Sequence, residues 1–100
     1  MVKNKYKIKA VVWIYPGPGG WHFISIPKKI SEEIKNNFAK LKKGWGSLPV
    51  TITVGKTTWQ TSIFPDTKMG VYLLPFKAEA RKKERIIKGI EIKINLEIKV

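Results

Sequence analysis

The sequence predicts a mainly β protein with two short helices, folded as a small closed barrel built from two ββαβ halves. Three observations predict this class. Apolar residues alternate with polar ones over most of the chain, which is the period of a strand. The spacing changes to that of a helix only twice. The order strand, strand, proline, helix, strand occurs around "FISIPKKI" and again around "VYLLPFKA", and closing a short-stranded sheet removes its edges.

The first half begins with a strand over residues 6–15. Its second part loses its polar face, which predicts that it is covered on both sides. "PGPGG" at residues 16–20 breaks this strand, and residues 21–26 form the returning strand of a hairpin. Ser31 is the predicted N-cap of a helix that stops at Gly44. The apolar stripe of this helix recurs at intervals of three and four residues: Ile30, Ile34, Phe38 and Leu41.

The second half begins with a hairpin over residues 49–64. Its connection "GK" places glycine first, which is the signal for a type II′ turn. "VGKTT" is no phosphate-binding loop, because Val50 stands where that loop needs glycine and a strand follows where it needs a helix. "PDTKMG" turns the chain into a short strand over residues 71–74. Residues 76–85 predict a short helix, and residues 90–100 alternate strictly, as in a long half-buried strand.

The stretch "TWQTSIFPDTKMGVYLLPFK" reads like a signature, but most of its distinctive residues form turns and strands. Asp66 follows a proline in a turn, where its side chain can hydrogen-bond to its own backbone. The alternative interpretation is a ligand or partner site in which Trp59, Ser62 and Arg81 converge.

Length and composition describe one globular domain. The 100 residues, 43% of them hydrophobic, predict a single small β-barrel domain over residues 1–100. The absence of cysteine excludes a disulfide framework, thiolate zinc sites and a thiol nucleophile. Because neither a signal peptide nor a membrane helix is recognisable, we expect a soluble cytoplasmic protein without a membrane partner.

The net charge of +13 is the largest departure from an average composition. The 20 basic residues are all lysine except Arg81 and Arg85, and they are spread along the chain. An even lysine coat is typical of a solvated thermophilic surface, whereas nucleic-acid surfaces cluster their charge and use arginine. Both interpretations stay open. For the second, the candidate phosphate contacts are at the end of the first helix: Lys40, Lys42 and Lys43.

The sequence gives little indication of a catalytic site or a metal site. His22 is the single histidine and Asp66 the single aspartate, so neither a metal site nor an acid and base pair is predicted. A catalytic triad would require these two residues to converge with a hydroxyl, and nothing in the sequence indicates that they do. "KGWG" at residues 43–46 is similar to the aromatic motif of RNA-binding sheets but lacks its further aromatics. We expect no cofactor.

Several stretches resemble a known family: "WHFISIP", "KGWGSLPVTITVG", "TWQTSIFPDTKMGVYLLP", "KAEARK" and "IKGIEIKINLE". They are similar to family 1905 of the domains of unknown function. The resemblance implies a double-split β-barrel, shared in outline with the swapped-hairpin barrels of bacterial transition-state regulators and antitoxins, and it implies little about function. Its candidate site combines Arg81 with Trp59, Ser62 and Pro65. The family usually has aspartate after the late glycine, where this chain has Ile90, so no acidic role is carried over there.

The predicted function is that of a non-enzymatic binding module, either monomeric or a strand-exchanged dimer. The main alternative is a nucleic-acid or other polyanion binder that uses lysines and depends strongly on salt. The third is a small-molecule site or enzyme at a barrel mouth lined by tryptophans. A contiguous basic face in the structure would favour the nucleic-acid binder. A concave aromatic pocket that holds Arg81 would favour the small-molecule site, and the absence of both features would favour a scaffold.

Overall fold

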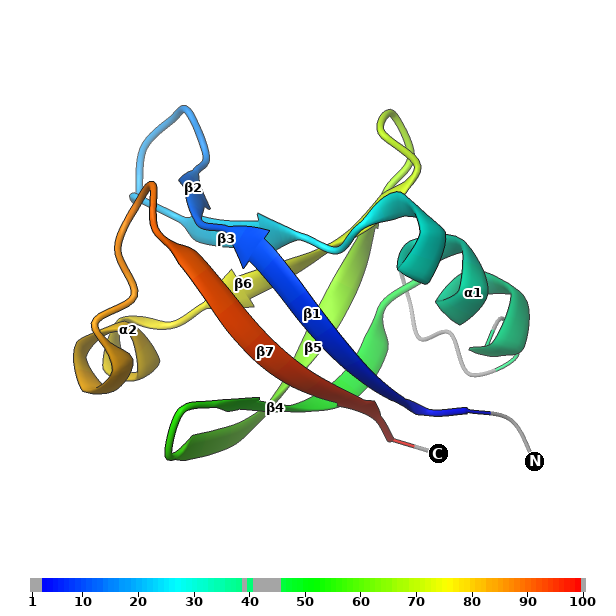
Figure 1. The fold of residues 1–100 in the computed structure, drawn as a ribbon. Helices are drawn as coiled ribbons and strands as arrows, with labels where there is room; N and C mark the ends of the chain where they lie inside the picture. Colours follow the sequence, from blue (N-terminus) through cyan, green and yellow to red (C-terminus); the bar gives the residue numbers. More distant parts are fainter. Residues whose placement is uncertain (1–2, 39, 41–45, 100) are drawn as a thin grey trace.

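The structure is a computed structural model that describes residues 3–38, 40 and 46–99. It confirms a mainly β chain with two helices (Figure 1). The elements follow the order β1 (Lys5–Val11), β2 (Trp13–Ile14), β3 (His22–Ser25), α1 (Lys28–Phe38), β4 (Leu48–Val54), β5 (Thr57–Asp66), β6 (Val71–Phe76), α2 (Ala78–Glu84) and β7 (Glu91–Ile98). In this part of the chain, no helix has the length and apolar character needed to cross a membrane.

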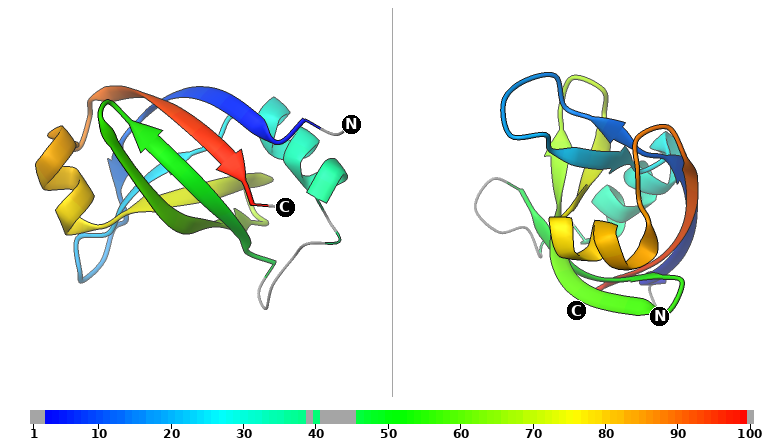
Figure 2. Two further views of the ribbon diagram at one scale, coloured as in Figure 1. Left: turned by 90° about the horizontal axis from the view of Figure 1, so that it is seen from below. Right: turned by 90° about the vertical axis from the view of Figure 1, so that its left-hand side faces the viewer.

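The strands form a seven-stranded sheet in the order β1-β7-β4-β5-β6-β3-β2. Every pairing in it is antiparallel. The sheet curves into a half-barrel, and the two helices lie at its opposite ends (Figures 1 and 2). β5 is shared, because its first part pairs with β4 and its last residues pair with β6. β1 and β2 stand at opposite ends of the strand order, although only Val12 separates them in sequence.

The core fills the concave side of the sheet. Alternation places every second residue of β4 and β7 there, as their burial patterns show. The largest fully buried side chains are aliphatic: Ile24, Ile26, Ile34, Leu48, Ile52, Ile63, Leu74, Ile86, Ile94, Leu96, Ile98 and Val12. Burying this apolar surface is the main favourable term in the folding of the chain.

Ser31 is a correction to the sequence prediction. The helix begins three residues earlier, at Lys28, and Ser31 lies inside it and is 2% exposed. Its hydroxyl donates to the Ile26 carbonyl at 2.9 Å and accepts from the Tyr72 amide at 3.0 Å. The hydroxyl thus satisfies two buried backbone groups and ties α1 to β6, which outweighs its preference for a cap position. The predicted stop at Gly44 lies outside the described residues.

The first strand is a second correction. Its apolar second part is not covered on both sides, because Val11 and Tyr15 are each 52% exposed. Only the inner side is buried there, with Val12 1% exposed. Because the exposed residues of this part are apolar as well, the sequence shows no polar face there even though one side is open to solvent.

The predicted hairpin turn at Gly55 and Lys56 is confirmed. Gly55 has φ 58, and Lys56 is not among the positive-φ residues, as a type II′ turn requires. The second helix is shorter than the predicted residues 76–85: it spans Ala78–Glu84, and its C-cap residue Arg85 adopts the left-handed conformation with φ 52. The Ile86 amide donates to the Arg81 carbonyl at 3.0 Å and closes this helix end.

Candidate functional site

α2 places Arg81 beside β3. Arg81 Nη1 lies 3.4 Å from His22 Nε2, and His22 Nδ1 lies 2.7 Å from the Gly20 carbonyl oxygen. Because a carbonyl only accepts, Nδ1 carries the proton of the neutral ring, and Nε2 accepts from the guanidinium. Sequence reasoning missed this pair, since 59 residues separate its members.

Trp59 lies at the same end of the sheet. It packs against the core, and its ring meets that of Phe76 with centroids 6.1 Å apart. Phe76 in turn is the register partner of His22. Within the described chain, Trp59 Nε1 and Arg81 Nε are buried without a hydrogen-bond partner. Solvent does not reach these two donors, although the Trp59 side chain lines a shallow depression of about 240 Å³ between β5 and α2.

Ser62 does not join this cluster. It has the strand parity of the exposed Gln60 and Phe64, whereas Trp59 has the parity of the fully buried Ile63. Successive residues of a strand point to opposite faces of the sheet. The structure therefore brings Trp59 and Arg81 to one end of the sheet and leaves Ser62 on its outer face.

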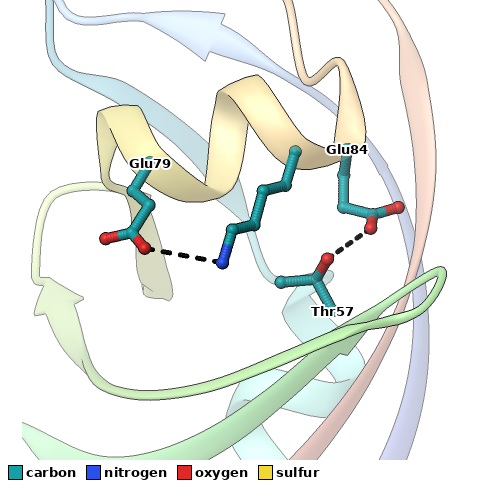
Figure 3. Close-up of polar contacts among 4 residues, drawn as sticks. Thr57, Glu79 and Glu84 are labelled. Atoms are coloured by element: carbon teal, nitrogen blue, oxygen red, sulfur yellow. Dashed lines mark hydrogen bonds and ion pairs between the residues drawn. The ribbon is translucent and has the colours of Figure 1, made fainter.

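The carboxylates of α2 contact groups other than Arg81 (Figure 3). The Thr57 hydroxyl donates to Glu84, and Lys83 Nζ lies 3.5 Å from Glu79 Oε1. Thr57, Glu79 and Lys83, but not Glu84, border the same shallow depression between α2 and β5. In the part of the chain that the structure describes, no carboxylate lies at ion-pair distance from Arg81.

Replacing Thr57 with valine is expected to lower the free energy of unfolding by about 1–2 kcal/mol. Valine keeps the shape of threonine, but Glu84 loses its hydrogen bond to β5. Urea unfolding measures the effect. Thr58→Val is the matched control, because the Thr58 hydroxyl contacts Thr53 on the exposed face. Equal losses in the two variants would contradict a specific tie between α2 and β5.

Asp66 has the predicted turn role. Its Oδ1 accepts from the amides of Lys68 at 3.1 Å and Met69 at 3.4 Å, and its carbonyl accepts from the Gly70 amide at 2.8 Å. Asp66 pairs with the first residue of β6, whereas His22 pairs with the last. About 17 Å of strand separates those positions, so the two residues cannot meet in a triad.

The outer side of β1 carries a contiguous basic surface. Two adjoining depressions of about 540 and 480 Å³ share Lys7, Thr53 and Asn95. We name this surface the lysine face, and its members are Lys3, Lys5, Lys7, Lys9, Thr51, Thr53, Lys93 and Asn95. Its lysines outnumber the two glutamates beside them, Glu97 and Glu91, of which Glu91 lies 3.5 Å from Lys9.

The lysine face is not where the sequence placed the phosphate contacts. Of those three candidates, Lys40 is exposed, and Lys42 and Lys43 lie outside the described residues. The lysine face instead arises from strand pairing, which sets Lys93 of β7 directly opposite Lys9 of β1.

An apolar depression lies on the outer side of β3, β5 and β6. Six residues line this depression of about 390 Å³: Tyr15, Trp21, Phe23, Phe64, Leu73 and Pro75. Trp13 adjoins them, because its ring centroid lies 5.2 Å from that of Phe23. We name these seven residues the aromatic face. The small-molecule alternative requires a concave aromatic surface that holds Arg81. Arg81 is not among these residues, so the two features are separate.

The model of a protein family described as a domain of unknown function, DUF1905, matches residues 9–96. The chain belongs to this family. The resemblance seen in the sequence is thereby confirmed. No curated protein matches the chain. The range matched to DUF1905 includes the whole aromatic face and the pair of Arg81 and His22, whereas Lys3, Lys5 and Lys7 precede it.

Proposed function

We propose that this DUF1905 domain is a non-enzymatic binding module and that it binds nucleic acid through the lysine face. The contiguity of that face carries the proposal. Lys5, Lys7 and Lys9 occupy alternate positions of β1, so all three point outward, about 7 Å apart along the strand. Lysines at such positions contact phosphates and release counterions, which is the main source of affinity for nucleic acids.

The uncharged polar groups between the lysines suit the same ligand, whereas Glu97 of the same depression does not. Thr51, Thr53 and Asn95 line the depressions that the lysines border. Hydroxyl and amide groups donate hydrogen bonds to phosphate oxygens and so help to set the position of the backbone. Because no arginine lies on this face to read a base by a bidentate contact, the proposed binding has little sequence specificity.

The proposal includes a closed double-split barrel formed by residues 1–100 as one domain. β1 pairs with β7 and β2 pairs with β3, and only Val12 lies between β1 and β2. β5 is shared in the corresponding way by β4 and β6. If β1 and β2 are one strand that continues through Val12, this strand joins the two ends of the sheet and closes the barrel. The first ββαβ half then supplies this shared strand, and the second half supplies β5. This arrangement supports one uninterrupted outer surface, in which the lysine face adjoins the aromatic face.

The test is a salt titration of binding to labelled duplex DNA, single-stranded DNA and RNA. We expect measurable binding at physiological salt and an affinity that falls steeply as salt rises. Replacing Lys5, Lys7 and Lys93 together with glutamine is expected to weaken binding to all three probes. The slope of log K against log salt should become shallower by about 0.7–0.9 for each phosphate that the variant no longer neutralises.

The matched control removes the same charge elsewhere, by replacing Lys40, Lys82 and Lys88 with glutamine. All three are exposed and lie outside the lysine face. This control should keep most of the affinity. Equal losses of affinity in the two triple variants, or binding that disappears by physiological salt for every probe, would mean that the +13 charge acts only as a general surface property.

A further inference from the structure

Contacts to phosphates leave the aromatic face without a role. We infer that this face stacks the unpaired bases of a single-stranded nucleic acid whose backbone lies on the lysine face. The inference rests on the proposed function and specifies the form of nucleic acid that is bound.

The exposure of the aromatic side chains is the first argument. Trp21 is 58% exposed, Tyr15 52% and Phe64 42%. An apolar depression that is lined by no charged group and open to solvent marks a binding surface more often than a stable solvent face. Bases offer flat π-faces to aromatic rings, and stacking tolerates any sequence. In a duplex those faces are covered by neighbouring base pairs, so the aromatic face selects single strands.

The arrangement of the rings is the second argument. Phe23 lies at the centre of a group in which the centroids of Trp13, Trp21 and Tyr15 are 5.2, 6.4 and 6.5 Å away. The planes of Trp21 and Phe23 differ by only 17°, so these two rings have nearly the same orientation.

Phe64 supplies a second stacking position. It lies on β5, on the far side of β6 from Phe23, because Phe64 pairs with Leu73 of β6 and Phe23 pairs with Pro75 of the same strand. Two strand spacings and an offset of two residues along β6 separate them, which together is about 12 Å. The aromatic face therefore has room for more than one base.

The third argument is the position of the lysine face next to the aromatic face along the first strand. The positive charge of the lysine face indicates a ligand with negative charge. β1 leads directly into β2 (Figure 1). The outward row of β1 carries Lys5, Lys7 and Lys9, and Trp13 follows on β2 with Phe23 as its register partner. A basic surface thus leads directly into an aromatic one. A ligand that suits both must carry regular negative charge and flat apolar groups, and a single-stranded nucleic acid does.

The experiment compares three probes: a labelled single-stranded thymidine oligonucleotide, a labelled duplex and heparin, which is a polyanion without bases. Trp21→Ala and Phe64→Ala are each expected to weaken single-strand binding by about 5-fold to 150-fold, the range of base stacking on an aromatic side chain. Their affinities for the duplex and for heparin, and the salt slope, should stay unchanged. Trp21→Tyr keeps a stacking ring and should restore most of the affinity.

Controls separate this inference from the proposed function. Met69→Ala and Ile87→Ala remove exposed apolar side chains outside the aromatic face and should change nothing. Melting curves verify that each variant is folded. If the lysine variant weakens binding to all probes while Trp21→Ala and Phe64→Ala bind the oligonucleotide normally, the inference is overturned and the proposed function stands. The inference is also overturned if Trp21→Ala and Phe64→Ala leave all binding unchanged and only lower the mass of the protein measured by sedimentation. The aromatic face would then join two copies of the chain. If none of the three probes binds, both the proposed function and this inference are contradicted.

Discussion

Replacing Trp59 with alanine is expected to lower the free energy of unfolding by about 3 kcal/mol. Removal of a large aromatic side chain from a core costs about 3–5 kcal/mol, because apolar burial is reduced and a cavity remains. Trp59 belongs at the low end, because it is only partly buried although it packs against the core and Phe76. Urea unfolding followed by circular dichroism measures the change.

Trp59→Phe is the matched control. Phenylalanine keeps an aromatic ring beside Phe76 and removes the indole N–H, which is buried and has no partner among the described residues. Removing an unsatisfied donor relieves its desolvation cost, so this variant should be close to the parent in stability. If Trp59→Ala unfolds at the same urea concentration as the parent, the ring contributes no packing and Trp59 is free for a binding role.

Replacing Ser31 with alanine is expected to destabilise the protein by about 2–4 kcal/mol, although only one oxygen is removed. The hydroxyl bridges the Ile26 carbonyl and the Tyr72 amide in the interior. Alanine leaves both backbone groups without this partner, and each buried unsatisfied group costs about 1–3 kcal/mol. The loss of stability should appear as a lower urea midpoint with an unchanged m-value.

The control for Ser31→Ala is Glu32→Ala in the same helical turn. Glu32 is exposed, so its replacement should change stability by less than about 0.5 kcal/mol. Similar, small effects of both variants would show that water or a backbone shift replaces the Ser31 bridge, which would contradict its role in tying α1 to β6.

Much of the fold could be predicted from the sequence because short-range chemistry specifies it. The strict alternation of residues 90–100 corresponds to β7, with inner residues buried and outer ones exposed. Asp66 and Gly55 have the turn roles that their side-chain and backbone chemistry predicted. The predicted start of α1 was wrong, since a serine that suits a cap has better partners in the interior.

The candidate site could be predicted only in part. Trp59 and Arg81 lie at one end of the sheet, beside Phe76 and its register partner His22, but Ser62 was grouped with them without regard to strand parity. The aromatic face was missed, because Tyr15, Trp21 and Phe64 come from separate segments. Each of them reads as a core residue when its own segment is considered alone.

The sequence by itself determined the strands, the turns and the excess of positive charge, because periodicity, turn chemistry and composition depend on neighbouring residues. Only the tertiary structure decided which apolar side chains face solvent and which lysines lie side by side. Lys9 and Lys93 become neighbours through the register of β1 on β7, and Phe23 meets Trp13 through that of β3 on β2. The first contact joins segments far apart in the chain, and the second depends on the register across a loop, so the pattern of one segment alone specifies neither of them.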